Sequence, residues 1–241
     1  MVLRIADFRA FTFDCYGTLI DWELGIGTWL SQWAESHGVS PSGDELLQAF
    51  ARAENRVEQE NPTSIYPDIL EATLRSLGGE LGIEALPTEC AAFGASVGGW
   101  PPFPDTRSAL RLLKERYRLV VVSNVDRASF ARTNEKLGVA FDAIIMAEEV
   151  GAYKPDHRMF LRAFEVLKEM EIGRGQILHV AQSLYHDHVP AKELGLSTVW
   201  VNRRRGQQGW GATTPPPSPI VPDLEVGSLA ELVALDDAQR G

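Results

Sequence analysis

Short apolar runs recur along this chain, and amphipathic helical patterns separate most of them. The runs cover residues 10–13, 119–122, 144–146, 177–180 and 198–201. Runs of strand length that alternate with helices are typical of a parallel sheet with both faces covered. The segments 107–117 and 159–170 place apolar side chains on one side among charges, which predicts crossover helices. We therefore expect an α/β fold built on a doubly wound parallel sheet.

About a hundred residues separate the first two runs, far more than one crossover needs. Their pattern is helical, with apolar residues such as Trp29, Trp33, Phe50 and Leu70 at helical spacing. We predict that residues 22–100 form a helical cap inserted into a Rossmann-like core of residues 1–21 and 101–241. Ligands of open parallel sheets bind beyond the carboxyl ends of the strands, so such a cap would cover that edge.

The end of the chain contains a proline-rich segment, residues 213–219, which predicts an extended loop rather than helix or central strand. After it, residues 223–226 return toward the sheet. A short helix is expected from Ser228 to Leu232.

Composition bounds the class of protein. The chain has 241 residues, 44% of them hydrophobic, which is enough for a substantial core. It has no apolar stretch of bilayer length and no signal-peptide pattern at the N-terminus, so we expect no membrane partner and a cytoplasmic location. The formal net charge of −10 argues against a nucleic-acid partner. Two cysteines, Cys15 and Cys90, are too few for a disulfide framework or a structural zinc site.

Polar side chains follow each of the first four apolar runs. They are Asp14 and Thr18, then Ser123 and Asn124, then Lys154, and finally Gln182, Ser183 and Asp187. The carboxyl ends of parallel strands meet at one edge, so these side chains should converge. A carboxylate held against a lysine and several polar donors suits nucleophilic catalysis.

Separate roles can be assigned within this set. Asp14 is the predicted nucleophile, and Lys154 would keep it ionised and help to hold an anionic substrate. Thr18 and Ser123 would orient the carboxylate and bind charge. Asp187 would orient or activate water for a second half-reaction. Taken singly, Asp14 and Ser123 could instead cap helices, and Lys154 could be a surface lysine, but together they favour catalysis.

The same residues resemble the motifs of the haloacid dehalogenase superfamily. Four motifs occur in its order along the whole chain: residues 14–18, 122–124, 153–156 and the acidic segment around Asp187. The resemblance implies that Asp14 is the nucleophile and that Thr18, Ser123 and Lys154 serve the reacting group. It also implies a small-molecule substrate and permits a homodimer.

Tyr16 is the most selective residue of the first motif. Most phosphatases of the superfamily carry an aspartate there, which protonates the leaving alkoxide, and a tyrosine with a pKa of about 10 is a poor replacement. A halide leaving from carbon needs no proton. Asp-X-Tyr-Gly-Thr resembles the L-2-haloacid dehalogenases, which form and then hydrolyse an aspartyl ester without a metal. We therefore predict hydrolysis of a small 2-haloalkanoic acid, no cofactor and no metal site.

Departures from the dehalogenase pattern leave other functions open. Leu184 occupies the expected asparagine position, Phe160 replaces a tyrosine, and no arginine of the cap can be placed cleanly. These changes are predicted to alter substrate recognition. The segments around Asp14 and Asp187 also resemble the (S)-azetidine-2-carboxylate hydrolases, which open a strained ring by the same attack. A small-molecule phosphatase, for which Mg²⁺ would be expected, and a non-catalytic binding protein are the remaining alternatives.

Substrate contacts are predicted from residues beside the motifs and in the cap. The set is Cys15, Tyr16, Trp22, Arg52, Asn124 and Ser183. His186 and His188 flank Asp187, but this spacing is not that of a zinc site, so a supporting role is expected for both.

Overall fold

The computed structural model describes residues 3–241, and its centre is a parallel sheet of six strands in the order β3-β2-β1-β4-β5-β6. The strands are β1 (Ala10–Phe13), β2 (Arg118–Ser123), β3 (Ala143–Met146), β4 (Ile177–Ala181), β5 (Ser197–Val201) and β6 (Leu224–Val226). β1 pairs with β2 on one side and β4 on the other, so the strand order reverses at its carboxyl end. The predicted α/β, doubly wound Rossmann-like sheet is confirmed.

Alternating side chains of the strands pack into two cores on opposite faces of the sheet. Phe11, Phe13 and Val121 belong to one buried cluster, whereas Val120 and Val122 belong to the other. The first cluster is covered by α5 (Thr106–Lys114), α6 (Arg127–Leu137) and α10 (Leu229–Arg240). The second is covered by α8 (His157–Glu169) and α9 (Val189–Glu193). Burial on both faces explains why the strands are continuously apolar rather than alternating.

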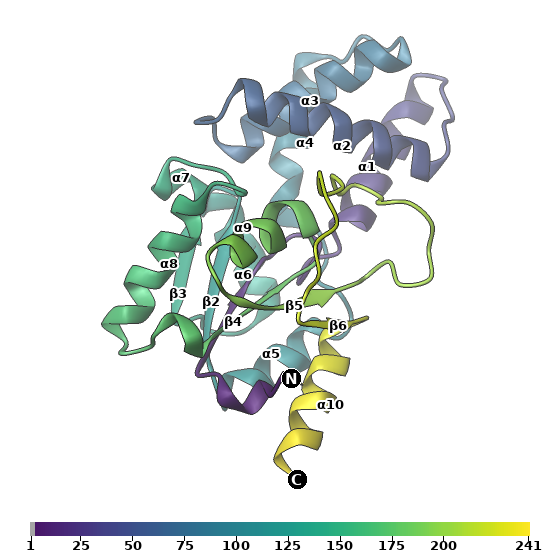
Figure 1. Cartoon of the computed structure of the whole chain (residues 1–241). Helices are drawn as coiled ribbons and strands as arrows, with labels where there is room; N and C mark the ends of the chain where they lie inside the picture. The colour runs from purple at the N-terminus through teal and green to yellow at the C-terminus, as the bar shows by residue number, and fades with distance from the viewer. Residues whose placement is uncertain (1–2) are drawn as a thin grey trace.

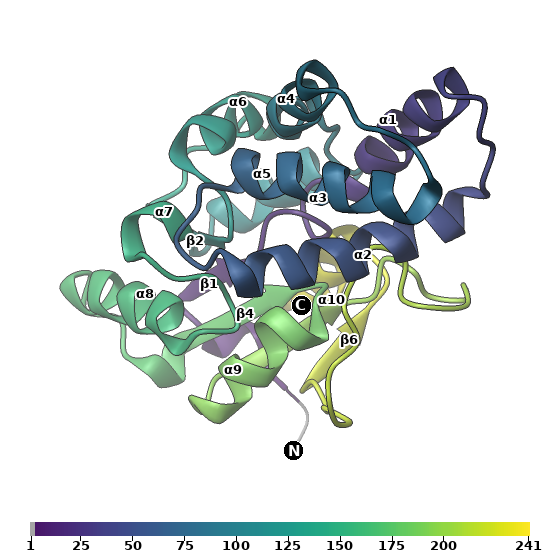
Figure 2. The same cartoon turned by 90° about the horizontal axis from the view of Figure 1, so that it is seen from above.

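Four helices between β1 and β2 lie together over one end of the sheet (Figure 1). They are α1 (Trp22–Ser36), α2 (Gly43–Glu60), α3 (Tyr66–Leu81) and α4 (Pro87–Ser96). Seen from above, α2 passes over the carboxyl edge of the sheet (Figure 2). All four helices fall within the predicted cap range, and the division of the chain into core and cap stays a prediction.

The start of α2 illustrates how local sequence sets these helices. Ser42 accepts a hydrogen bond from the Glu45 amide at 3.3 Å, and the Glu45 carboxylate accepts one from the Ser42 amide at 2.9 Å. This reciprocal capping box satisfies two amides that the first helical turn would otherwise leave free. The apolar face of α2 then packs inward through residues such as Leu46, Phe50 and Val57.

The C-terminal segment differs from its prediction in one respect. The last helix, α10, runs over Leu229–Arg240 and does not end at Leu232. Its extension is anchored by the buried Asp236, which accepts hydrogen bonds from Tyr117 at 2.6 Å and Arg116 at 2.8 Å. The partner of this carboxylate is a distant segment, so local pattern alone could not show where the helix ends.

The short helix α7 (Ala147–Val150) follows β3. The proline-rich segment, residues 213–219, forms a loop before β6, as predicted. Among residues 3–241, no helix combines the length and the apolar character needed to cross a membrane.

Candidate active site

A tight turn places Asp14 directly after β1, where the strand order of the sheet reverses. The Asp14 amide donates to the Val180 carbonyl at 3.2 Å, which continues the sheet pairing up to the site. Gly17 then adopts a φ of +91°, and a side chain there would meet Trp22 and Gln182. A glycine is therefore required for the chain to turn back toward the cap.

The backbone around Lys154 is fixed by Asn124. The Asn124 side chain accepts a hydrogen bond from the Lys154 amide at 2.6 Å and donates one to the Lys154 carbonyl at 3.2 Å. The loop after β2 thus holds the loop after β3. Both polar atoms of the Asn124 side chain are used in this contact, so its position favours orientation of Lys154 over the predicted role in binding substrate.

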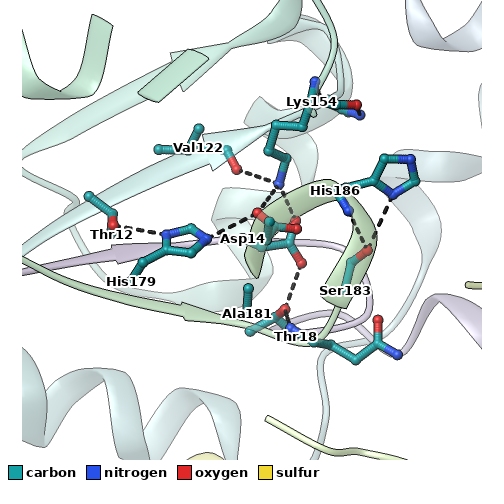
Figure 3. Close-up of polar contacts among 12 residues, drawn as sticks. Thr12, Asp14, Thr18, Val122, Lys154, His179, Ala181, Ser183 and His186 are labelled. Atoms are coloured by element: carbon teal, nitrogen blue, oxygen red, sulfur yellow. Dashed lines mark hydrogen bonds and ion pairs between the residues drawn. The ribbon is translucent and has the colours of Figure 1, made fainter. Parts of the chain in front are cut away.

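The Lys154 ammonium connects the two carboxylates of the site. It donates to Asp14 at 2.8 Å, to Asp187 at 2.8 Å and to the Val122 carbonyl at 3.0 Å (Figure 3). Thr18 donates to the other oxygen of Asp14 at 2.6 Å and accepts from the Gln182 amide at 2.9 Å. Asp14, Thr18, Lys154 and Asp187, predicted from three separate motifs, therefore form one buried network.

Burial and charge set the protonation of this network. Burial raises the pKa of Asp14 above its ordinary value, and Lys154 and Thr18 oppose this effect only in part. Burial also works to raise the pKa of Asp187, but Lys154 and His179 outweigh it and lower that pKa below its usual range. The two carboxylates keep the pKa of Lys154 above its ordinary value despite its burial. Lys154 is therefore a permanent cation, and Asp187 a permanent anion.

His179 is a member of the network that sequence reasoning missed. It lies within β4, fully buried, with Nε2 at 3.1 Å from Asp187 and Nδ1 at 2.9 Å from the Thr12 hydroxyl (Figure 3). A histidine between Leu178 and Val180 in a buried strand was the available signal, because a polar side chain there needs partners.

The network opens into a small cavity of about 50 Å³ between the sheet edge and the cap. Among the predicted substrate-binding residues, Tyr16, Trp22, Asn124 and Ser183 line it, together with Ser123 from the catalytic set. Ser183 accepts a hydrogen bond from the His186 amide at 3.1 Å, within a π-helical turn formed by Leu184–His188. Such turns often occur at functional sites.

The two histidines beside Asp187 have different places. His186 lines the cavity, and burial lowers its pKa to about 4, so its ring is neutral at neutral pH. His188 is fully buried with Nε2 at 3.0 Å from the Ala181 carbonyl. Within the described range 3–241, neither ring belongs to a group of side chains that could hold a metal ion.

The Tyr16 hydroxyl is paired with a side chain of α6. It lies 2.8 Å from the Thr133 hydroxyl on α6, and its ring contacts Trp100 edge-on at 5.7 Å between centroids. Burial raises the pKa of Tyr16 well above its ordinary value. Tyr16 is therefore unsuited to protonate a leaving group, which is the property predicted from its place in the motif.

The cap supplies acidic side chains that were not predicted. Glu54 and Glu58 of α2 line the cavity, as does Tyr66, whose hydroxyl donates to Glu54. Glu54 is 6% exposed. Its spacing from Phe50 and Val57 places it on the apolar face of α2, which was the available sequence signal.

Two predicted substrate contacts lie away from the cavity. Cys15 is fully buried in the apolar core. Arg52 points to a separate cavity beside the loop containing Trp210, where its side chain is 63% exposed and lies 3.8 Å from Glu80. Arg52 lies on the opposite face of α2 from Glu54, because positions two residues apart in an α-helix point in nearly opposite directions. Neither residue lines the cavity beside Asp14, and both substrate contacts stay predictions.

The departures at Leu184 and Phe160 also lie outside the cavity lining. Leu184 is the first residue of the π-helical turn and is buried, and the Phe160 ring packs edge-on against His179 at 5.1 Å between centroids. The altered substrate recognition expected from these two changes stays a prediction.

The carboxylates do not form a site suited to Mg²⁺. Asp14 and Asp187 both direct Oδ1 at the Lys154 ammonium, and the second oxygen of Asp14 accepts from Thr18. Magnesium requires near-octahedral oxygen ligands. Across residues 3–241, no three His, Cys, Asp or Glu side chains are grouped so that they could hold a metal ion.

An aspartate–lysine network at the carboxyl edge of a doubly wound parallel sheet, below a helical layer, places this protein among the α/β enzymes that bind ligands at a topological switch point. The family model of the haloacid dehalogenase-like hydrolases matches residues 8–182, and the chain belongs to this family. The resemblance read from the four motifs is confirmed.

Curated relatives and solved structures agree with this assignment. The chain is 30% identical to an (S)-2-haloacid dehalogenase of Pseudomonas sp. (strain YL), with 97% of this chain and 96% of the relative covered. The structure of the L-2-haloacid dehalogenase PA0810 matches with a TM-score of 0.73 and 25% identity over 96% of this chain and 99% of the other. The defluorinating L-2-haloacid dehalogenase Rha0230 shares the fold, with a TM-score of 0.78 and 20% identity over 100% of both chains.

Proposed function

We propose that this hydrolase cleaves the bond between carbon and a leaving group in a small 2-substituted carboxylic acid, as an L-2-haloacid dehalogenase does. Asp14 is the nucleophile, and Lys154, Thr18, Ser123 and Asp187 are its catalytic partners. The observation that carries the proposal is the pairing of a fixed Asp14 carboxylate with a Tyr16 hydroxyl that is bound elsewhere. The site therefore has a nucleophile, but the residue at position 16 is not an acid that could protonate a leaving group.

In the first half-reaction, an ionised Asp14 oxygen attacks the substrate carbon. The bond between carbon and halogen breaks, the halide leaves with the bonding electrons, and an ester with Asp14 forms. Lys154 and Thr18 hold the two carboxylate oxygens at 2.8 and 2.6 Å, which fixes the attack geometry. No proton is transferred in this step, so no group is needed at Tyr16.

In the second half-reaction, water adds to the ester carbonyl carbon of Asp14, and the 2-hydroxy acid is released. Asp187 is the residue placed to orient this water. Its Oδ1 is occupied by Lys154 and His179, whereas Oδ2 is buried and has no hydrogen-bond partner among the described residues. The net change is the exchange of halide for hydroxide, with one proton released to solvent.

Isotope labelling tests this mechanism. In a single turnover in heavy-oxygen water, the label should enter Asp14, because the oxygen of the attacking water stays on the carboxyl carbon of Asp14 while the original ester oxygen leaves with the product. Mass spectrometry of the Asp14 peptide measures it. Label that appears only in the product of the first turnover would refute the ester.

A substrate panel assigns the broken bond. We expect turnover of L-2-chloropropionate, and the panel includes L-azetidine-2-carboxylate and a generic phosphate ester, each with and without Mg²⁺. Asp14→Asn should abolish turnover of whichever substrate reacts. Release of phosphate in the absence of any carbon-centred reaction would overturn the proposal.

The same proposal includes the setting in which the enzyme works. It acts on a small-molecule substrate in the cytoplasm and can form a homodimer through the cap. Light scattering of the purified protein at several concentrations tests the dimer.

A further inference from the structure

Two acidic side chains of the cap face the reacting carboxylate. Glu54 and Glu58 lie one turn apart on α2 and line the same cavity as Asp14 and Lys154. Residues at this spacing share one face of a helix. The Tyr66 hydroxyl, donating to Glu54, fixes the position of that side chain.

The cavity has more negative than positive groups. Its lining carries the carboxylates of Asp14, Glu54, Glu58 and Asp187 against the single ammonium of Lys154. That ammonium is already paired with Asp14 and Asp187 at 2.8 Å each. Burial raises the pKa of Glu54 to about 7 and, with Glu54 nearby, raises that of Glu58 well above its ordinary value. Ionised, these groups would need a cation that the protein does not supply.

A second observation points to the same missing group. Asp187 lines the cavity, is 1% exposed, and its Oδ2 has no hydrogen-bond partner among residues 3–241. A buried carboxylate oxygen without a donor is costly. A ligand that brings N–H donors and positive charge would satisfy both this oxygen and the cap glutamates.

We propose that Glu54 and Glu58 determine specificity by binding a protonated amine of the substrate, close to the carbon that Asp14 attacks. The inference rests on the proposed attack by Asp14 and adds a preference, among small 2-substituted carboxylic acids, for those that also bear an amine. Hydrogen bonds between an ammonium and carboxylates are charge-assisted and strong. A carboxylic acid without an amine instead adds negative charge to a cavity that already carries an excess of it.

A matched pair of ring acids tests the amine directly. L-Proline and cyclopentanecarboxylate have nearly the same shape and both carry a carboxylate, but only L-proline carries an ammonium, and its unstrained ring resists opening. Calorimetric titration of the wild-type enzyme at about pH 8, where the amine stays protonated, should show at least about tenfold tighter binding of L-proline.

Variants assign this preference to the cap. Glu54→Gln and Glu58→Gln should each reduce the preference for L-proline at least about threefold. Glu60→Gln, on the exposed end of the same helix, is the matched control and should keep it. Thermal unfolding of each variant confirms that it is folded. Equal binding of the two acids, tighter binding of cyclopentanecarboxylate, or no binding of either would overturn the inference.

The binding and turnover experiments can refute the amine site and the proposed function separately. If L-2-chloropropionate is hydrolysed but L-proline is not preferred, attack by Asp14 stands and the amine site is wrong. If L-proline binds through Glu54 and Glu58 but Asp14→Asn changes no turnover, the amine site stands and the proposed function is wrong.

Discussion

The pH dependence of stability offers a direct test of the buried glutamate Glu54. Burial, opposed only by the hydrogen bond from Tyr66, raises its pKa from 4.5 to about 7. The folded protein therefore holds this proton more tightly than the unfolded chain does. The stabilisation is complete below about pH 4.5 and is lost as the pH rises through about 7.

The magnitude follows from the two pKa values. At about 1.4 kcal/mol per pH unit, the rise from 4.5 to about 7 corresponds to about 3 kcal/mol once both states are ionised. Between pH 5 and pH 8.5 the wild type should lose about 2 to 3 kcal/mol of unfolding free energy through this group. Glu54→Gln keeps a hydrogen-bond acceptor for Tyr66 and removes the charge. Relative to the wild type, the variant should gain about 2 to 3 kcal/mol between these pH values.

Urea unfolding at about pH 5 and about pH 8.5, followed by circular dichroism without ligand, measures this gain. Glu60→Gln, at the exposed end of α2, controls for the loss of one glutamate on the same helix. If Glu54→Gln changes the stability equally at both pH values, or destabilises the protein more at high pH, burial does not raise the pKa of Glu54 in the folded protein.

Three further changes test the site. Lys154→Met leaves Asp14 and Asp187 unpaired, so turnover should fall by at least about 10²-fold and stability by about 3 kcal/mol, measured by steady-state kinetics and urea unfolding; near-normal values would contradict the network. Tyr16→Phe should reduce kcat by less than about tenfold because its hydroxyl contacts Thr133, whereas a loss of about 10²–10⁴ would identify it as an acid. Arg52→Gln should leave KM within about twofold, since its exposed side chain lies outside the cavity, and a large rise in KM would return it to the substrate site.

Much of the core domain could be predicted from the sequence because strands, turns and motifs leave local sequence patterns. All five predicted strand runs appear in the sheet, and the sixth strand follows the proline-rich loop as the pattern indicated. The motif residues converge because a parallel sheet brings the carboxyl ends of its strands to one edge. That rule was sufficient to bring Asp14, Lys154 and Asp187 together from separate segments.

Which cap side chains face the cavity was harder to predict, because the rotation of a helix about its axis depends on the helices it packs against. Arg52 is a predicted substrate contact, yet Arg52 and its neighbour Arg56 both lie on the outer face of α2 near Glu80. Glu54 and Glu58 occupy the face turned to the cavity. Packing of Phe50 and its apolar neighbours against the other cap helices selects this rotation.

The sequence by itself determined the sheet, the nucleophile candidate and its family, because these depend on periodicity and on motif order. Only the tertiary structure showed that His179 contacts Asp187, that the Tyr16 hydroxyl is bound to Thr133, and that Glu54 and Glu58 of the cap line the cavity. Those facts concern the direction of side chains from separate elements, and close packing in three dimensions decides that direction.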